Sequence, residues 1–178
     1  MAGVVEAFGA DYLRAKSLSP ILYLDVEGES DHPALPQKYY ERWSKAICAG
    51  HKVGDTILPF RPAVYLNHGD DPNSSLSLNA ACAAGAVCVG VSVAYYVHKD
   101  GSKDPASPPP PPEKMVWNTN DIVPRPLPIP HGHPDAKIPV LVWQYHGDFD
   151  GDIDPELVNP AYEALVMSGT VPAPAPAA

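Results

Sequence analysis

The spacing of apolar and polar positions predicts alternating helices and strands along most of the chain. Apolar side chains at helical spacing predict helices, and short apolar runs rich in β-branched and aromatic residues predict buried strands. Gly50 and Gly85 follow two of the helical patterns and mark their ends. In chain order, the predicted elements are a helix over 4–16, a strand over 21–27, a helix over 36–49, a strand over 61–67, a helix over 76–84, a strand over 87–97, a strand over 138–145 and a helix over 160–167.

Strands that are separated by helices run parallel and are joined by crossover connections, so the pattern predicts an α/β fold. Both an open sheet and a (β/α) barrel satisfy this pattern. The chain has 178 residues, which is room for one domain, and we assign that domain to residues 1–167. Residues 168–178 form a Pro/Ala-rich tail.

Proline interrupts the alternation in one long segment. The chain holds 23 prolines, and twelve of them fall within the 35 residues from Pro105 to Pro139. Such a segment is stiff and extended and is unsuited to a central strand. We therefore interpret residues 99–137 as a proline-rich insertion strapped over the domain, with a ligand for an aromatic groove as the other interpretation.

Charge and composition exclude several classes of function. A formal net charge of -9 leaves no basic surface for nucleic acid. No apolar run reaches the roughly 18 residues of a membrane span, and no Sec signal peptide is visible, which predicts a cytoplasmic protein or one delivered by a non-Sec route. The three cysteines are an odd number without a CxxC pair and are expected to be free thiols, and no cofactor motif is present.

Two acids close the first predicted strand. Asp25 and Glu27 are two residues apart and should lie on one side of it, about 6.6 Å from each other. Neighbouring carboxylates repel, which raises the pKa of one and keeps it protonated as an acid. Such a pair suits the cleavage of a glycosidic bond, although two solvated acids at a strand end explain the same residues.

The late strand ends in Trp143, Gln144 and Tyr145, a combination that suits sugar rings and also suits core packing. Four alternating acids follow in residues 148–154, and this run resembles a calcium loop without the EF-hand spacing. His-x-His at residues 131–133 is a weak metal pattern, so we predict no metal site. The histidines and acids considered as metal ligands are His131, His133, His146, Asp148, Asp150, Asp152 and Asp154.

Several of these motifs, in this order, resemble the glycoside hydrolase family 25 lysozymes, which cut β-1,4 bonds of peptidoglycan. Residues 23–27 (YLDVE) resemble the DxE motif of the family's central strand, and residues 62–66 and 93–96 resemble its next two strands. Residues 142–145 (VWQY), with the Gly/Asp loop that ends at Asp154, resemble its closing segment. The resemblance spans about residues 5 to 165.

The resemblance implies a role for each matching residue. Glu27 would be the general acid, and Asp25 would orient the substrate acetamide or stabilise the transition state. Asp154, or Asp152 in the alternative alignment, would be the acid of the late strand. Tyr65, Tyr95, Trp143, Gln144 and Tyr145 would bind the sugars.

The family fold is a (β/α) barrel whose first strand supplies another active-site Asp, and no residue here matches it. The resemblance therefore predicts an incomplete, TIM-type barrel with an open edge that a second copy or a larger assembly covers. The chain would be a fragment of a longer enzyme, a subunit completed by another, or a relic of a hydrolase. Its function would be cleavage of peptidoglycan or, alternatively, that of a non-catalytic structural or glycan-binding module in a larger assembly.

Overall fold

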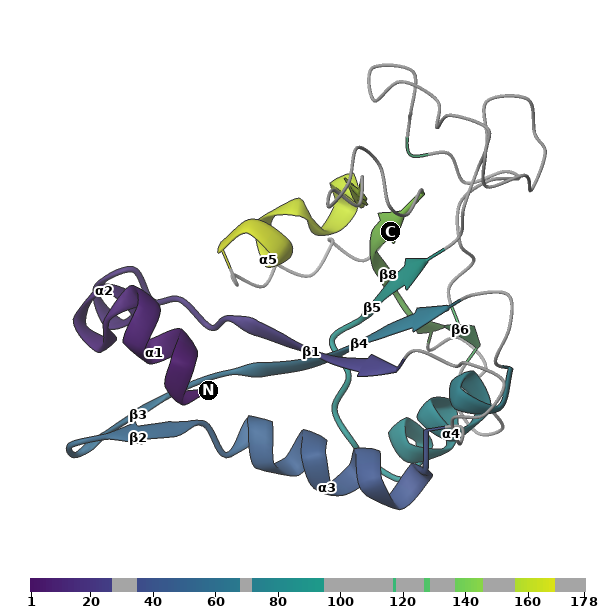
Figure 1. Cartoon of the computed structure of the whole chain (residues 1–178), viewed down its shortest axis with the longest axis horizontal. Coiled ribbons are helices and arrows are strands. Elements are labelled where there is room, and N and C mark those ends of the chain that lie inside the picture. Colours follow the sequence, from purple (N-terminus) through teal and green to yellow (C-terminus); the bar gives the residue numbers. More distant parts are fainter. Residues whose placement is uncertain are drawn as a thin grey trace, which may run out of the picture.

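The computed structural model describes residues 1–26, 35–67, 72–94, 117, 127–128, 137–145 and 156–168. Its centre is a five-stranded sheet in the order β1-β4-β5-β8-β9 (Figure 1). The first four strands are parallel, and β9 runs antiparallel to β8 at the far edge. The strands are β1 (Ile21–Val26), β4 (Arg61–Asn67), β5 (Val91–Ala94), β8 (Val140–Gln144) and β9 (Glu156–Val158).

The mostly parallel sheet confirms the α/β class. Two helices make crossover connections: α3 (Gln37–Cys48) joins β1 to β4, and α4 (Pro72–Ala83) joins β4 to β5. Because strand order follows chain order and such crossovers are right-handed, both helices lie on one face of the sheet. Among the described residues the sheet is open, and no closed barrel is present.

The main core lies between α3, α4 and this helix face of the sheet. Alternate residues of each strand point to it, such as Val64 and Leu66 of β4 and Val91 and Val93 of β5, and all four are at most 3% exposed. Tyr40 of α3 packs against them and is completely buried. Of the apolar stripe that predicted α3, Tyr40 and Ile47 are buried, whereas Tyr39 and Cys48 are exposed.

The opposite face of the sheet is covered at the amino ends of its strands by α5 (Glu163–Ser168). Leu165 of this helix is 5% exposed and packs against Leu141 and Val142 of β8. Figure 1 shows α5 on the other side of the sheet from α3 and α4. We call the part of this face toward the carboxyl ends of the strands the polar face, after the residues that it carries: Tyr23, Asp25, Tyr65, Ser92, Gln144 and Glu156.

A smaller core lies at the other end of the molecule. The predicted helix over 4–16 is broken at Gly9 (φ 79) into α1 (Ala2–Phe8) and α2 (Ala10–Ala15). The sequence did not predict the hairpin of β2 (His51–Val53) and β3 (Thr56–Leu58). Leu13, Ile47, Leu58 and Phe60 bring these elements and α3 together.

Other predicted boundaries change in the structure. The helix predicted over 76–84 begins earlier, at Pro72, and the strand predicted from residue 87 begins at Val91. Pro139 separates β7 (Lys137–Ile138), which pairs with β6 (Leu127–Pro128), from β8. The final helix starts as a 3-10 turn, Pro160–Tyr162, that continues into α5.

Strand β1 forms an edge of the sheet. The Pro20 carbonyl accepts from the Arg61 amide at 3.0 Å, so the backbone of Leu22, Leu24 and Val26 also faces β4. The amides and carbonyls of the alternate residues 21, 23 and 25 therefore face outward, where the described part of the chain supplies no strand. Whether a second copy covers this edge stays a prediction.

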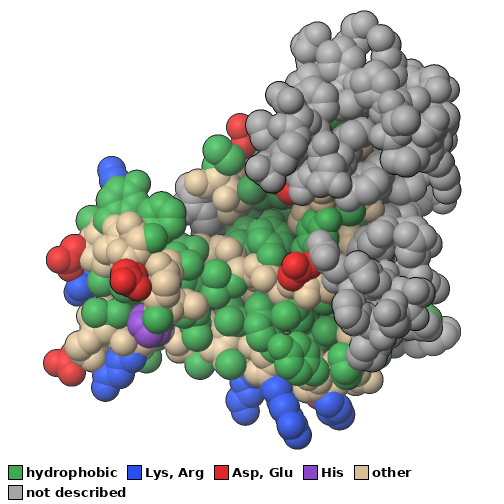
Figure 2. All heavy atoms as spheres, in the orientation of Figure 1, with side chains coloured by type: hydrophobic (Ala, Val, Ile, Leu, Met, Phe, Trp, Pro, Cys, Tyr) green, Lys and Arg blue, Asp and Glu red, His purple; other side chains and the backbone are tan. Residues whose placement is uncertain are grey.

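The surface around this edge is apolar, and charged side chains of α3 lie along its border. Figure 2 shows hydrophobic side chains over β1 and α3, with Lys and Arg side chains projecting from α3 along the lower border. Those residues are Lys38, Arg42 and Lys45. In the described parts of the chain, no helix is long and apolar enough to cross a membrane.

Candidate functional site

Asp25 is the acid of the DxE motif that the structure describes. It lies one residue before the carboxyl end of β1, and its side chain is exposed on the polar face. Tyr65 of β4 is its register partner, so the two residues are neighbours across the strands, about 4.8 Å apart. In parallel sheets, functional groups collect at this end of the strands.

Tyr65 and Gln144 connect two strands that are not adjacent. The Tyr65 hydroxyl donates a hydrogen bond to Oε1 of Gln144 at 2.5 Å, and this bond passes from β4 over β5 to β8. Gln144 is 3% exposed and Tyr65 is half-buried. The sequence placed both residues in the predicted sugar-binding set, and the structure brings them together beside Asp25.

Small side chains on β5 make this bond possible. Ser92 is the register partner of Tyr65, and Ala94 is the register partner of Gln144. Both are about 5% exposed, so they lie beneath the Tyr65 side chain as it crosses the strand. The Ser92 hydroxyl has no hydrogen-bond partner in the part of the chain that the structure describes.

We expect Tyr65→Phe to lower the free energy of unfolding by about 1–3 kcal/mol. The substitution leaves the buried Gln144 amide without the hydroxyl that it accepts from, and an unsatisfied buried polar group carries a cost of this size. Tyr39→Phe is the matched control, because Tyr39 is 52% exposed and the same change there should stay within about 0.5 kcal/mol. Urea denaturation measures both, and equal losses in the two variants would contradict a structural role for the bond.

Two further residues of the polar face escaped the sequence analysis. Glu156 opens β9 and is the register partner of Gln144, two residues after the predicted late acid, Asp154. Tyr23 lies on β1 and is 37% exposed. Burial, and next the negative charge of Glu156, raise the pKa of Tyr23 to about 12. The charge of Glu156 on β9 thus reaches Tyr23 on β1, a relation between distant segments that no local sequence signal reveals.

Trp143 and Tyr145 lie in the interior. Trp143 is 1% exposed, and its register partner Val93 places it on the helix face. Tyr145 is 2% exposed, and its ring meets that of Trp143 edge to face at 5.9 Å. With no open ring surface, the two aromatics pack the core in this structure, and their predicted stacking on sugars would need the core to open.

The remaining predicted site residues lie outside the described residues. These are Glu27, Tyr95 and Asp154, together with the alternative acid Asp152, the acidic run 148–154 and the histidines of residues 131–146. The described part of the chain holds no group of three or more His, Cys, Asp or Glu side chains placed to bind a metal ion.

The described polar face offers exposed carboxylates next to a phenol and an amide that are held rigidly together. Such groups form hydrogen bonds with a neutral, polyhydroxylated ligand, and the acids disfavour an anionic one. Comparisons of the chain with protein-family models, curated proteins and solved structures found no match.

Proposed function

We propose that the protein is a glycoside hydrolase that cleaves β-1,4 bonds of a peptidoglycan-like polymer by acid catalysis. The row formed by Asp25, Tyr65 and Gln144 at the carboxyl ends of parallel strands carries this proposal. The strand order also supports it, because strands that follow chain order with crossover helices on one face are what an incomplete (β/α) barrel requires.

In this mechanism, the polar face binds the sugar and Glu27 protonates the leaving oxygen. Glu27 stands two residues after Asp25 in the sequence, the spacing that we expect of two acids on one side of a strand. Asp25 orients the acetamide of the substrate or stabilises the positive charge that develops on the sugar ring. Tyr65 hydrogen-bonds to the sugar hydroxyls, and the buried Gln144 holds the Tyr65 phenol in place. Asp154 and Tyr95 complete the site.

We expect purified peptidoglycan to release reducing ends when the wild-type chain is added. Glu27→Gln should lower that rate by about 100-fold to 10,000-fold, because it removes the proton donor with little change of shape. The matched control is Glu6→Gln in α1, since Glu6 is exposed and distant from the sheet's carboxyl end. It should keep the wild-type rate.

Two results would overturn the proposal: a rate for Glu27→Gln equal to the wild-type rate, or an inactive wild-type chain in a folded sample. Circular dichroism before each assay establishes that the variants are folded.

Within the described residues the edge of β1 has no neighbouring strand, and this favours a second function, that of a non-catalytic module in a larger assembly. This edge holds three outward-facing residues, Ile21, Tyr23 and Asp25, and no Lys or Pro that would discourage pairing. A folded, inactive chain that elutes as a stable oligomer in size-exclusion chromatography would support this function over hydrolysis.

A further inference from the structure

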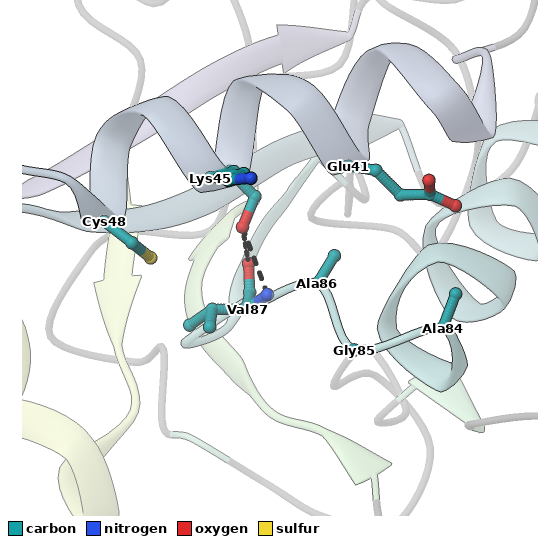
Figure 3. Close-up of a pocket in the computed structure, with 8 residues that line it drawn as sticks. Glu41, Lys45, Cys48, Ala84, Gly85, Ala86 and Val87 are labelled. Carbon is teal, nitrogen blue, oxygen red and sulfur yellow. Dashed lines mark hydrogen bonds between the residues drawn. The ribbon is translucent and has the colours of Figure 1, made fainter.

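A pocket of about 300 Å³ lies between α3 and the segment 84–87, which follows α4 and leads toward β5 (Figure 3). Segment 84–87 forms one wall of this pocket, and four residues of α3 form the other: Glu41, Ser44, Lys45 and Cys48. A volume of this size is at the lower end of the range that holds small molecules. The pocket belongs to the helix layer, and the polar face lies on the other side of the sheet.

Hydrogen bonds from two buried side chains hold the walls of the pocket together. The Ser44 hydroxyl donates to the Val87 carbonyl at 2.7 Å and accepts from the Val87 amide at 3.1 Å. The Tyr40 hydroxyl donates to the same carbonyl at 2.9 Å. Ser44 and Tyr40 are at most 1% exposed. The pocket is therefore formed before a ligand arrives, which keeps the entropy cost of binding small.

Much of the lining is apolar. Figure 3 shows the side chains of Ala84, Ala86 and Val87 on the wall opposite α3. Val87 is 47% exposed and the Cys48 thiol on α3 is also exposed, so both surfaces are available to a ligand. Such a lining favours a ligand with a hydrocarbon part.

Lys45 brings a positive charge to the pocket. Glu41 stands four residues before it, a spacing at which helices commonly form ion pairs. The Glu41 carboxylate instead accepts from Lys38 and from Gln37, each at 2.8 Å. In the part of the chain that the structure describes, the Lys45 ammonium has no hydrogen bond or ion pair. Lys45 is therefore placed to bind an anionic group of a ligand.

The Glu41 carboxylate limits the charge that this group can carry. The bonds from Lys38 and then Gln37 lower the pKa of Glu41, so it is ionised at neutral pH. A phosphate ester has nearly two negative charges at this pH, and Glu41 would repel it more strongly than it repels a carboxylate. One ammonium beside an apolar wall thus suits a single carboxylate on a hydrocarbon body.

We propose that this pocket binds a small carboxylic acid with an apolar body. The carboxylate pairs with Lys45, and the hydrocarbon part lies against Cys48 and the segment 84–87. The inference is independent of the proposed hydrolase activity, because the pocket and the polar face lie on different sides of the sheet and the test measures binding alone.

The test measures how ligands protect Cys48 from alkylation by iodoacetamide, a neutral reagent. The probes are octanoate and octanamide, which share the same tail and differ in charge. Peptide mapping by mass spectrometry follows Cys48, with Cys82 and Cys88 as internal references outside the pocket. We expect both probes to slow the alkylation of Cys48, with octanoate effective at about fivefold lower concentration, the effect of one ion pair at an exposed site.

Lys45→Gln should remove the preference for octanoate, because the ammonium is gone. Lys52→Gln is the matched control, since Lys52 is exposed on β2 and lies outside the pocket. It should keep the wild-type preference. Ala84→Leu should end protection by both probes, because the larger side chain fills the pocket, and the exposed position of Ala84 tolerates the change.

Three results would contradict this assignment. Neither probe protects Cys48 in the wild-type chain, octanoate and octanamide protect it at equal concentrations, or Lys45→Gln keeps the preference for octanoate.

Discussion

Trp143→Ala is expected to lower the free energy of unfolding by about 3–5 kcal/mol, the largest stability effect that we predict for one side chain. Trp143 is 1% exposed on β8, which lies between β5 and the edge strand β9. Its removal leaves a cavity against Val93 and takes the edge-to-face contact from Tyr145. Such a cavity closes poorly, because the strands on both sides are fixed by backbone hydrogen bonds.

Denaturant unfolding of Trp143→Ala also distinguishes a role of this ring in core packing from a role in sugar binding. Trp143→Phe should recover most of the stability, because it restores a buried ring. Phe8→Ala is the control for an exposed aromatic, since Phe8 is 60% exposed, and it should cost far less. A Trp143→Ala protein as stable as the wild type that no longer binds peptidoglycan would show that the ring contacts sugar and does not pack the core.

Gly50→Ala should lower the free energy of unfolding by about 2–5 kcal/mol, from left-handed backbone strain and overpacking together. Gly50 has a φ of 74 just after α3. A Cβ there would lie 2.6 Å from the backbone oxygen of Leu58 and 2.7 Å from Cγ2 of Ile57. The backbone oxygen cannot rotate away, so α3 or the β2–β3 hairpin must shift.

Gly54→Ala is the matched control for this prediction. Gly54 also has a positive φ, 60, but an added Cβ would meet nothing within 4 Å. It therefore reports the backbone strain alone, which is about 1–2 kcal/mol. Thermal or urea unfolding of both variants measures the difference, and equal losses would mean that the close approach of Gly50 to Leu58 contributes nothing.

The sequence predicted most of the central elements, because their signals are local. The alternation of apolar runs with helical stripes located β1, α3, β4 and β8 to within a few residues. It also predicted the parallel α/β class, since strands separated by helices must be joined by crossovers. Gly50 was correctly identified as the end of α3.

Elements with short or ambiguous signals were predicted less well. The three-residue strands of the β2–β3 hairpin are too short for a period to show, and β9 starts after the acidic run that suggested a loop. In the sequence, Gly9 is a single glycine that a helical pattern tolerates. In the structure its φ of 79 divides the predicted helix into α1 and α2.

For the site, the sequence alone determined which residue types stand at the strand ends: an acid at Asp25, a phenol at Tyr65 and an amide at Gln144. Only the tertiary structure decided which of them meet, because side chains on β4 and β8 become neighbours when a small residue, Ala94, lies between them on β5. The tertiary structure also decided that Trp143 lies on the helix face, whereas its neighbour Gln144 lies on the polar face. Successive residues of a strand point to opposite faces, and the packing of α3 and α4 selects the face that becomes the core.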